Sequence, residues 1–109
     1  MSFINLNQFE EIEFFQGYLG RFVHSNNMTL AFVRVKAGAR LPEHSHPHEQ
    51  ICNVIEGEFE LTVEGKPNLM KADNTYNIPS NATHSGKAIT DCKIIDAFYP
   101  VREDFKNLK

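Results

Sequence analysis

The sequence has little of several features that mark particular classes of protein. It contains 11 Lys and Arg against 14 Asp and Glu, and the resulting net charge of −3 offers no basic surplus to neutralise a phosphate backbone. Its purely apolar runs, such as residues 30–33, are far shorter than the roughly 20 residues with which a helix crosses a bilayer. We therefore expect neither a nucleic acid nor a membrane as a partner.

Two further absences concern the cellular compartment. Residues 1–15 carry three glutamates where an export signal would have a positive flank and an apolar stretch. Cysteine is scarce, and the two thiols, Cys52 and Cys92, are more often free than bridged in a chain without such a signal. These features predict a cytoplasmic protein with two free thiols.

The length and composition that are present describe an ordinary globular chain. With 109 residues, of which 41% are hydrophobic and 23% charged, the sequence fits one domain over residues 1–109. Turn-forming Gly, Pro, Asn and Asp recur about every 8–12 residues, the spacing of short strands joined by turns. The expected fold class is all-β, a single small antiparallel β-barrel or jelly roll with a core over about residues 28–99.

The strand pattern is clearest where apolar residues alternate with polar ones. Phe59, Leu61 and Val63 alternate in this way within residues 58–64, which predicts a half-exposed hairpin arm after a turn at 56–57. Further strands are expected at 28–36, 50–56, 75–78 and 92–99, a turn at 65–68, and helical or irregular structure over the first dozen residues and 101–109.

Three of the five histidines, His44, His46 and His48, fall within five consecutive positions. His44 and His46 are two residues apart, so that on a strand both imidazoles project from the same face. Two inward imidazoles are costly to desolvate unless a partner binds their lone pairs, and a divalent metal does so. The pair predicts a metal site, whereas the isolated His24 is expected to be an ordinary hydrogen-bonded residue.

Parity along the chain indicates the other ligands. Gln50 lies four residues beyond His46 and keeps the parity of the same face, whereas Glu49 has the opposite parity unless Pro47 introduces a bend or bulge. A fourth donor must come from another strand, and His84, which follows the turn at 79–83, is placed to supply it. Three neutral imidazoles and one neutral amide leave the charge of a divalent ion undiminished, which suits Ni, Mn, Fe, Co or Zn acting as a Lewis acid.

The histidine region resembles the sequence motifs of the cupins. The first cupin motif, G(x)5HxH(x)3,4E(x)6G, is met in register, with glutamine in place of the usual glutamate, by Gly38, His44, His46, Gln50 and Gly57. The second motif is met more weakly, by Pro79 and His84. The resemblance implies the cupin fold, a double-stranded β-helix, with a metal held by His44, His46, Gln50 and His84.

Longer strings narrow the resemblance to the small pectin-degradation cupins. The chain is similar to them in HSHPHEQ, EGEFELTVEG, IPSNATHS and DCKIIDAFYPVREDF, which lie between residues 38 and 105. Members of that group convert 4,5-unsaturated uronate monosaccharides, the products of pectin or alginate lyases, into linear keto sugars. The resemblance implies a small anionic sugar as the substrate and places Asp96, Phe98 and Arg102 around it.

The chemistry of these side chains suggests a role for each. Asp96 shares a strand face with Ile94 and Phe98, so if that face lines the barrel the carboxyl group looks toward the metal and can move a proton. The metal would polarise the hemiacetal while Asp96 shuttles the proton that turns the enol ether into a ketone. Arg102 can clamp a carboxylate in a bidentate geometry, Phe98 can stack on the sugar, and His48 can contact its hydroxyl groups.

Two other functions would use the same barrel mouth. One is a non-catalytic sugar- or metabolite-binding cupin, and the other is a metal-dependent cupin oxygenase, against which the neutral Gln50 weighs. The N-terminal segment also carries more apolar side chains than one small core needs, which predicts a homodimer. These side chains are Phe3, Ile4, Phe9, Phe14 and Phe15.

Overall fold

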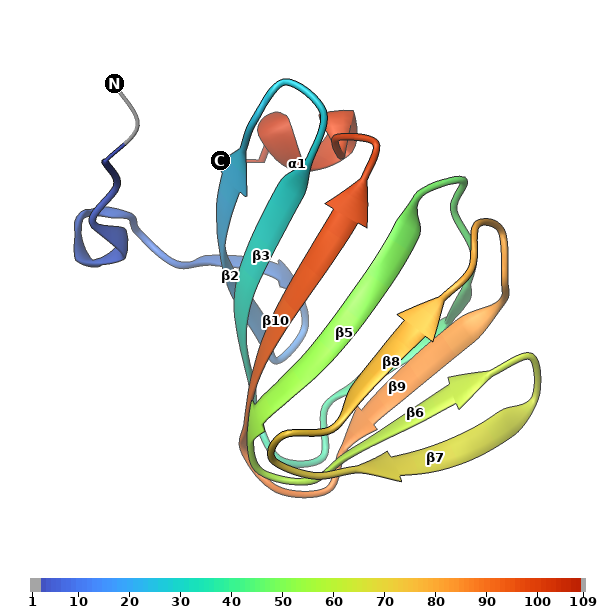
Figure 1. The fold of residues 1–109 in the computed structure, drawn as a ribbon. Helices are drawn as coiled ribbons and strands as arrows, with labels where there is room; N and C mark the ends of the chain where they lie inside the picture. The colour runs from blue at the N-terminus through green and yellow to red at the C-terminus, as the bar shows by residue number, and fades with distance from the viewer. Residues whose placement is uncertain (1–2, 109) are drawn as a thin grey trace.

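The computed structural model describes residues 3–108, in which ten strands form two antiparallel sheets that face each other (Figure 1). No helix in this part of the chain has the length and hydropathy that a membrane span requires. In chain order the elements are η1 (Leu6–Gln8), β1 (Ile12–Phe15), β2 (Tyr18–His24), β3 (Thr29–Val35), β4 (Arg40–His44), β5 (Glu49–Glu56), β6 (Phe59–Val63), β7 (Lys66–Met70), β8 (Thr75–Ile78), β9 (His84–Ala88), β10 (Cys92–Tyr99) and α1 (Glu103–Lys106).

The strand order brings distant segments side by side. The larger sheet has the order β1-β2-β3-β10-β5-β8, and the smaller sheet has the order β4-β9-β6-β7. Because the chain changes sheet at each step from β3 to β6, β10 returns to lie between β3 and β5 (Figure 1). This is a jelly-roll arrangement. The expected all-β class is confirmed, and over residues 3–108 it takes the form of two facing sheets rather than a closed barrel.

Alternating side chains supply the core between the two sheets. On β6, Phe59, Leu61 and Val63 are buried and the residues between them are half-buried, which confirms the alternation expected from the sequence. Each such side chain contributes roughly 1.5–3 kcal/mol when it leaves water. Cys52 and Cys92 belong to the same core as free thiols, which is also as expected.

The hairpin of β6 and β7 corrects one expected turn. Residues 65–68 were expected to be a turn, but the turn is Glu64-Gly65 alone, and β7 begins at Lys66, which pairs with Val63. Both turn residues have positive φ, +49° and +78°, as a two-residue hairpin requires. Pro67 does not prevent a strand because β7 is at the edge of its sheet, where a missing amide hydrogen is tolerated.

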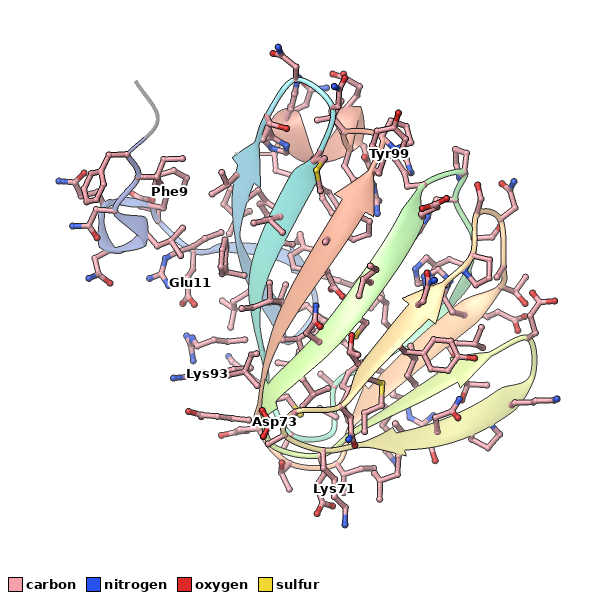
Figure 2. The ribbon with its side chains drawn as sticks, viewed as in Figure 1. Phe9, Glu11, Lys71, Asp73, Lys93 and Tyr99 are labelled. Carbon is pink, nitrogen blue, oxygen red and sulfur yellow. The ribbon has the colours of Figure 1, made fainter. Side chains whose placement is uncertain are left out.

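The N-terminal segment extends away from the sheets and is held at its base. Figure 2 shows Phe9 and Glu11 on this segment, beside β2. The Arg21 guanidinium donates to the carbonyl oxygen of Phe9 at 3.0 Å, and Glu11 accepts two hydrogen bonds of 2.7 Å from Arg34. Phe14 turns inward, 5.4 Å from the ring of Phe22. The segment therefore contributes one aromatic ring to this chain's own core.

Gly57, in the turn between β5 and β6, is where an added side chain would be least tolerated. Its φ is +90°, and a Cβ there would meet the carbonyl oxygen of Asp91, whereas Gly65, with φ +78°, has open space. We expect Gly65→Ala to lower the free energy of unfolding by about 1 kcal/mol through left-handed strain. Gly57→Ala should cost about 1–3 kcal/mol more through overpacking. Denaturant unfolding of both variants measures the difference, and equal losses would contradict the close approach to Asp91.

Candidate functional site

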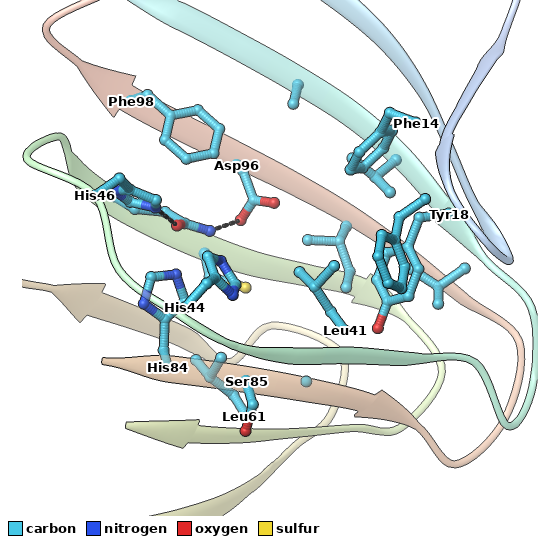
Figure 3. A pocket seen from close by; sticks show the side chains of 18 of the residues that line it. Phe14, Tyr18, Leu41, His44, His46, Leu61, His84, Ser85, Asp96 and Phe98 are labelled. Carbon is cyan, nitrogen blue, oxygen red and sulfur yellow. Dashed lines mark hydrogen bonds between the residues drawn. The ribbon is translucent and has the colours of Figure 1, made fainter. Parts of the chain in front are cut away.

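Three histidines meet between the two sheets. His44 ends β4 and His84 begins β9, and antiparallel pairing places the two residues directly opposite each other. His46 lies in the connection between β4 and β5. One ring nitrogen from each histidine lies within 4.8 Å of the others. Figure 3 shows the three imidazoles gathered at one side of the pocket.

This convergence has a different cause from the one expected. The sequence pattern placed His44 and His46 on the same face of one strand, but β4 ends at His44 and its register with β9 is irregular after Leu41. Pro47 has no amide hydrogen and so does not continue a strand ladder. His46 therefore lies in the irregular connection that follows β4 and not on the strand, so strand parity does not account for the direction of its ring.

The connections that carry His46 and His84 are tied to each other. The backbone N–H of Asn81 donates to the carbonyl oxygen of His46 at 2.8 Å, and the Ser80 hydroxyl donates to the carbonyl oxygen of Pro47. Asn81 has φ +66°, a conformation that asparagine tolerates better than most residues. We refer to these two hydrogen bonds as the loop clamp.

Each of the three imidazoles is fixed in one tautomer by the main chain. The Nδ1 atoms lie 2.8 Å from the carbonyl oxygen of Pro42 for His44, 3.0 Å from that of His48 for His46, and 2.9 Å from that of Ala82 for His84. A carbonyl oxygen only accepts, so each Nδ1 carries the hydrogen and each Nε2 keeps a free lone pair. This arrangement is typical of histidines that bind metals.

Gln50 contributes a fourth acceptor atom to the cluster. It is 8% exposed on the inward face of β5, whereas Glu49 faces solvent. Its Oε1 lies 3.2 Å from Nε2 of His46, so two lone pairs face each other. In addition, Nε2 of His84 is buried without a hydrogen-bond partner among the described residues. A cation satisfies both atoms, and the residues present therefore fit a divalent metal.

Burial favours the neutral form of two of the imidazoles, those of His46 and His84. Burial, together with the charges of Arg102 and His84, lowers the pKa of His46 to about 4. Burial also lowers the pKa of His84. Both rings are therefore unprotonated at neutral pH, and a metal ion has no proton to displace from them.

Asp96 stands next to this cluster on β10. Its Oδ1 accepts a hydrogen bond of 2.9 Å from Nε2 of Gln50, whose other amide atom faces His46 (Figure 3). Burial raises the pKa of Asp96 to about 6, even though the hydrogen bond from Gln50 acts in the opposite direction. Asp96 is therefore a carboxyl group that can both accept and release a proton near neutral pH.

Arg102 lines the same site and stacks on Phe98. The guanidinium carbon lies 4.7 Å from the centroid of the Phe98 ring and 3.9 Å from that of Phe105. Two of its nitrogens donate to the carboxylate of Asp104, Nε at 3.0 Å and Nη2 at 2.8 Å. The Arg102 side chain is only 12% exposed, so its charge acts on the site with little screening.

One cavity of about 230 Å³ joins these groups. Its polar part is formed by His44, His46, Gln50, His84, Ser85, Asp96 and Arg102. The remainder is largely apolar and is lined by side chains that include Phe14, Tyr18, Leu41, Phe59, Leu61, Ile94 and Phe98. The cavity therefore has a charged end with metal-type donors and an apolar end.

His48 stands apart from the groups that the cavity joins. It is not among the described residues that line the cavity, and its ring centroid lies 5.4 Å from that of His46. Its carbonyl oxygen, rather than its ring, supports the cluster by accepting from Nδ1 of His46.

Several lining residues were not identified from the sequence. Cys52 lies two residues beyond Gln50 on β5, so the strand alternation could have identified it. Phe14 and Tyr18 come from β1 and β2, which the sequence pattern did not predict as strands. No local signal shows that these rings reach the same cavity.

The fold and site together define a class of protein: a jelly roll in which both sheets enclose a cavity with converging imidazoles. The family model for the cupin domain matches residues 31–98, which is more than half of the chain. The chain belongs to the cupin family.

Individual relatives agree with this assignment. The chain is 31% identical over 83 residues to the pectin degradation protein KdgF of Dickeya dadantii, covering 74% of this chain and 76% of that protein. The structure of KdgF from Halomonas sp. superposes with a TM-score of 0.90 at 26% identity, covering 96% of this chain and 98% of that one. An RmlC-like cupin from Shewanella frigidimarina superposes with a TM-score of 0.91 at 27% identity, covering 96% of both chains.

The donor cluster predicts that metal binding stabilises the fold through His84. With free Ni, Mn, Co or Zn ions at about 100 times their dissociation constant, the free energy of unfolding should rise by about 2.7 kcal/mol. The rise should disappear in His84→Ala and persist in His24→Gln, because His24 bonds Thr29 instead. Thermal unfolding of each variant with and without the ion measures this. An unchanged rise in His84→Ala would rule out the site.

Proposed function

We propose that this cupin converts a 4,5-unsaturated uronate monosaccharide into its linear keto form, with a divalent metal held by His44, His46, Gln50 and His84. The likeness to KdgF, a protein named for pectin degradation, supports this class of substrate. The observation that carries the proposal is the position of Asp96. Its carboxyl group, whose pKa is raised to about 6, lies in the same cavity as the donor cluster and is hydrogen-bonded to one member of it.

The cavity suits a ligand of one sugar ring. Pockets for drug-sized ligands commonly measure about 300–1,000 Å³, and this cavity of about 230 Å³ is smaller. Among its lining residues, Arg102 supplies a planar, bidentate cation of the kind that recognises a carboxylate. Phe98 presents an aromatic face beside it. We assign Arg102 to the uronate carboxylate and Phe98 to the sugar ring. We assign His48 an indirect role, in which its carbonyl oxygen orients the ring of His46.

In the proposed reaction Asp96 moves one proton. Its carboxylate takes the proton of the anomeric hydroxyl as the bond between C1 and the ring oxygen breaks, which leaves an aldehyde at C1 and an enolate over C4, C5 and the former ring oxygen. Asp96 then returns that same proton to C4, and the enolate becomes a ketone at C5. The product is an isomer of the substrate, so no co-reactant is needed, and general acid–base catalysis of this kind contributes about 10²–10⁴-fold.

The metal's contribution follows from the donor set. A divalent ion on three imidazoles and one amide oxygen would keep its full charge and supply Lewis acidity at the hemiacetal oxygens. The chain contributes the fixed lone pairs, and Gln50 links the metal site to Asp96 because its amide faces both.

Replacing Asp96 tests the proposed catalytic role. We expect Asp96→Asn to lower turnover of unsaturated uronates at least about 100-fold, while the purified variant keeps its metal content because Asp96 is not a proposed ligand. Loss of the ultraviolet absorbance of the enol ether measures turnover. Glu56→Gln, which removes an exposed carboxylate from the end of β5, is the matched control and should behave like the native chain.

Measurements of turnover, uronate affinity and oxygen consumption separate the proposal from its two alternatives. Native turnover in Asp96→Asn would contradict the role of Asp96. Retained uronate affinity without turnover in the native chain would indicate a binding cupin. Consumption of oxygen with bound iron would indicate a cupin oxygenase.

We also propose that the chain forms a homodimer. Phe3 is 89% exposed and Ile4 45% exposed on the extended N-terminal segment, and Ile51 and Tyr99 are 44% and 56% exposed on the outer face of the larger sheet. A contact between two copies of the chain would remove these apolar side chains from water. Light scattering after gel filtration at micromolar concentration should give twice the chain mass of 12.5 kDa. The mass of a monomer would contradict the proposal.

A further inference from the structure

The guanidinium of Arg102 lines the cavity and also binds the carboxylate of Asp104, which is not among the described residues that line the cavity. Arg102 lines the cavity, and Asp104, two residues later at the start of α1, occupies its Nε and Nη2. The Asp104 side chain is 60% exposed, whereas that of Arg102 is 12% exposed. The hydrogen bonds from Arg102 also lower the pKa of Asp104, which is therefore ionised at neutral pH.

Asp104 makes the same kind of contact that a uronate would make. A carboxylate binds arginine best through two parallel N–H···O bonds along one edge of the guanidinium. Asp104 already uses one such edge, and its negative charge offsets the cation. A ligand carboxylate must displace Asp104 or bind the other edge of a guanidinium whose charge is already neutralised. In both cases Asp104 opposes the binding of the ligand.

Other contacts hold Arg102 in place without Asp104. The guanidinium stacks on Phe98 and Phe105, at 4.7 Å and 3.9 Å from the ring centroids. The backbone N–H of Arg102 donates to Oγ1 of Thr29, a fully buried residue on β3, at 2.9 Å. Removal of the Asp104 charge should therefore leave the cation in position and unpaired.

We propose that Asp104 is a specificity-determining residue: it competes with the ligand carboxylate for Arg102 and so sets the affinity of the site for anionic sugars. The inference rests on the proposed function, in which Arg102 binds the uronate carboxylate. Because the Asp104 carboxylate is 60% exposed, water competes with Arg102 for it, and Asp104 reduces affinity without preventing binding.

The experiment compares two neutralising substitutions in α1. Asp104→Asn removes the competing charge, and Glu103→Gln removes the adjacent charge, which pairs with Lys106 instead of Arg102. Calorimetry on the full chain as purified gives dissociation constants for galacturonate, a saturated uronate, and for neutral galactose. Asp104→Asn should bind galacturonate about two- to fivefold more tightly than the native chain, with galactose unchanged. Glu103→Gln should resemble the native chain, and so should Asp104→Glu, which keeps a carboxylate.

An Arg102→Gln variant separates failure of this inference from failure of the proposed function. If Arg102→Gln binds galacturonate as tightly as the native chain does, the assignment of Arg102 to the ligand carboxylate is itself wrong. If Arg102→Gln binds weakly and Asp104→Asn binds galacturonate no more tightly than the native chain, Arg102 does bind the ligand carboxylate and the proposed competition by Asp104 is wrong. Equal tightening in Glu103→Gln would attribute the effect to net charge and would also overturn the inference.

Discussion

The site depends on three short hydrogen bonds from imidazole Nδ1 atoms to main-chain carbonyl oxygens. Each bond joins residues only two positions apart, so the local backbone alone decides which way each ring faces. The backbone is in turn fixed by the pairing of His44 with His84 and by the loop clamp around His46. Three lone pairs are thereby held toward one point, and burial lowers the pKa of His46 and of His84.

Gln50 is the junction between this cluster and the rest of the cavity. Its amide oxygen faces His46 and its amide nitrogen faces Asp96, so the two ends of one side chain serve two kinds of chemistry. A glutamate at this position would have no hydrogen to donate and would place a negative charge beside Asp96. The glutamine therefore leaves the cluster neutral while it orients the carboxyl group.

The sequence predicts strands best where one face of the strand is buried, because apolar residues then occur at every second position. The alternation on β6 follows from this, whereas the bounds of β10 at residues 92–99 were expected from a run of apolar and β-branched residues. The edge strand β7 was missed because Pro67 and Gly65 look like a turn, and the edge position that tolerates the proline depends on the whole sheet. The prediction for the histidines assumed that His44 and His46 share one strand, whereas His46 lies in the connection after β4. The contact of Arg102 with both Asp104 and the cavity depends on how the chain end returns across β3, which no local pattern specifies.

The loop clamp has a consequence for how the pocket can open. A loop that makes no hydrogen bonds to its neighbours can unfold locally by itself, and this local unfolding costs little free energy compared with unfolding of the whole domain. Here Asn81 and Ser80, in the connection before β9, donate hydrogen bonds to the connection that carries His46. Neither of these two connections can move away without breaking the hydrogen bonds between them. The two connections therefore behave as one cooperative unit, and the positions of His46 and His84 are kept or lost together.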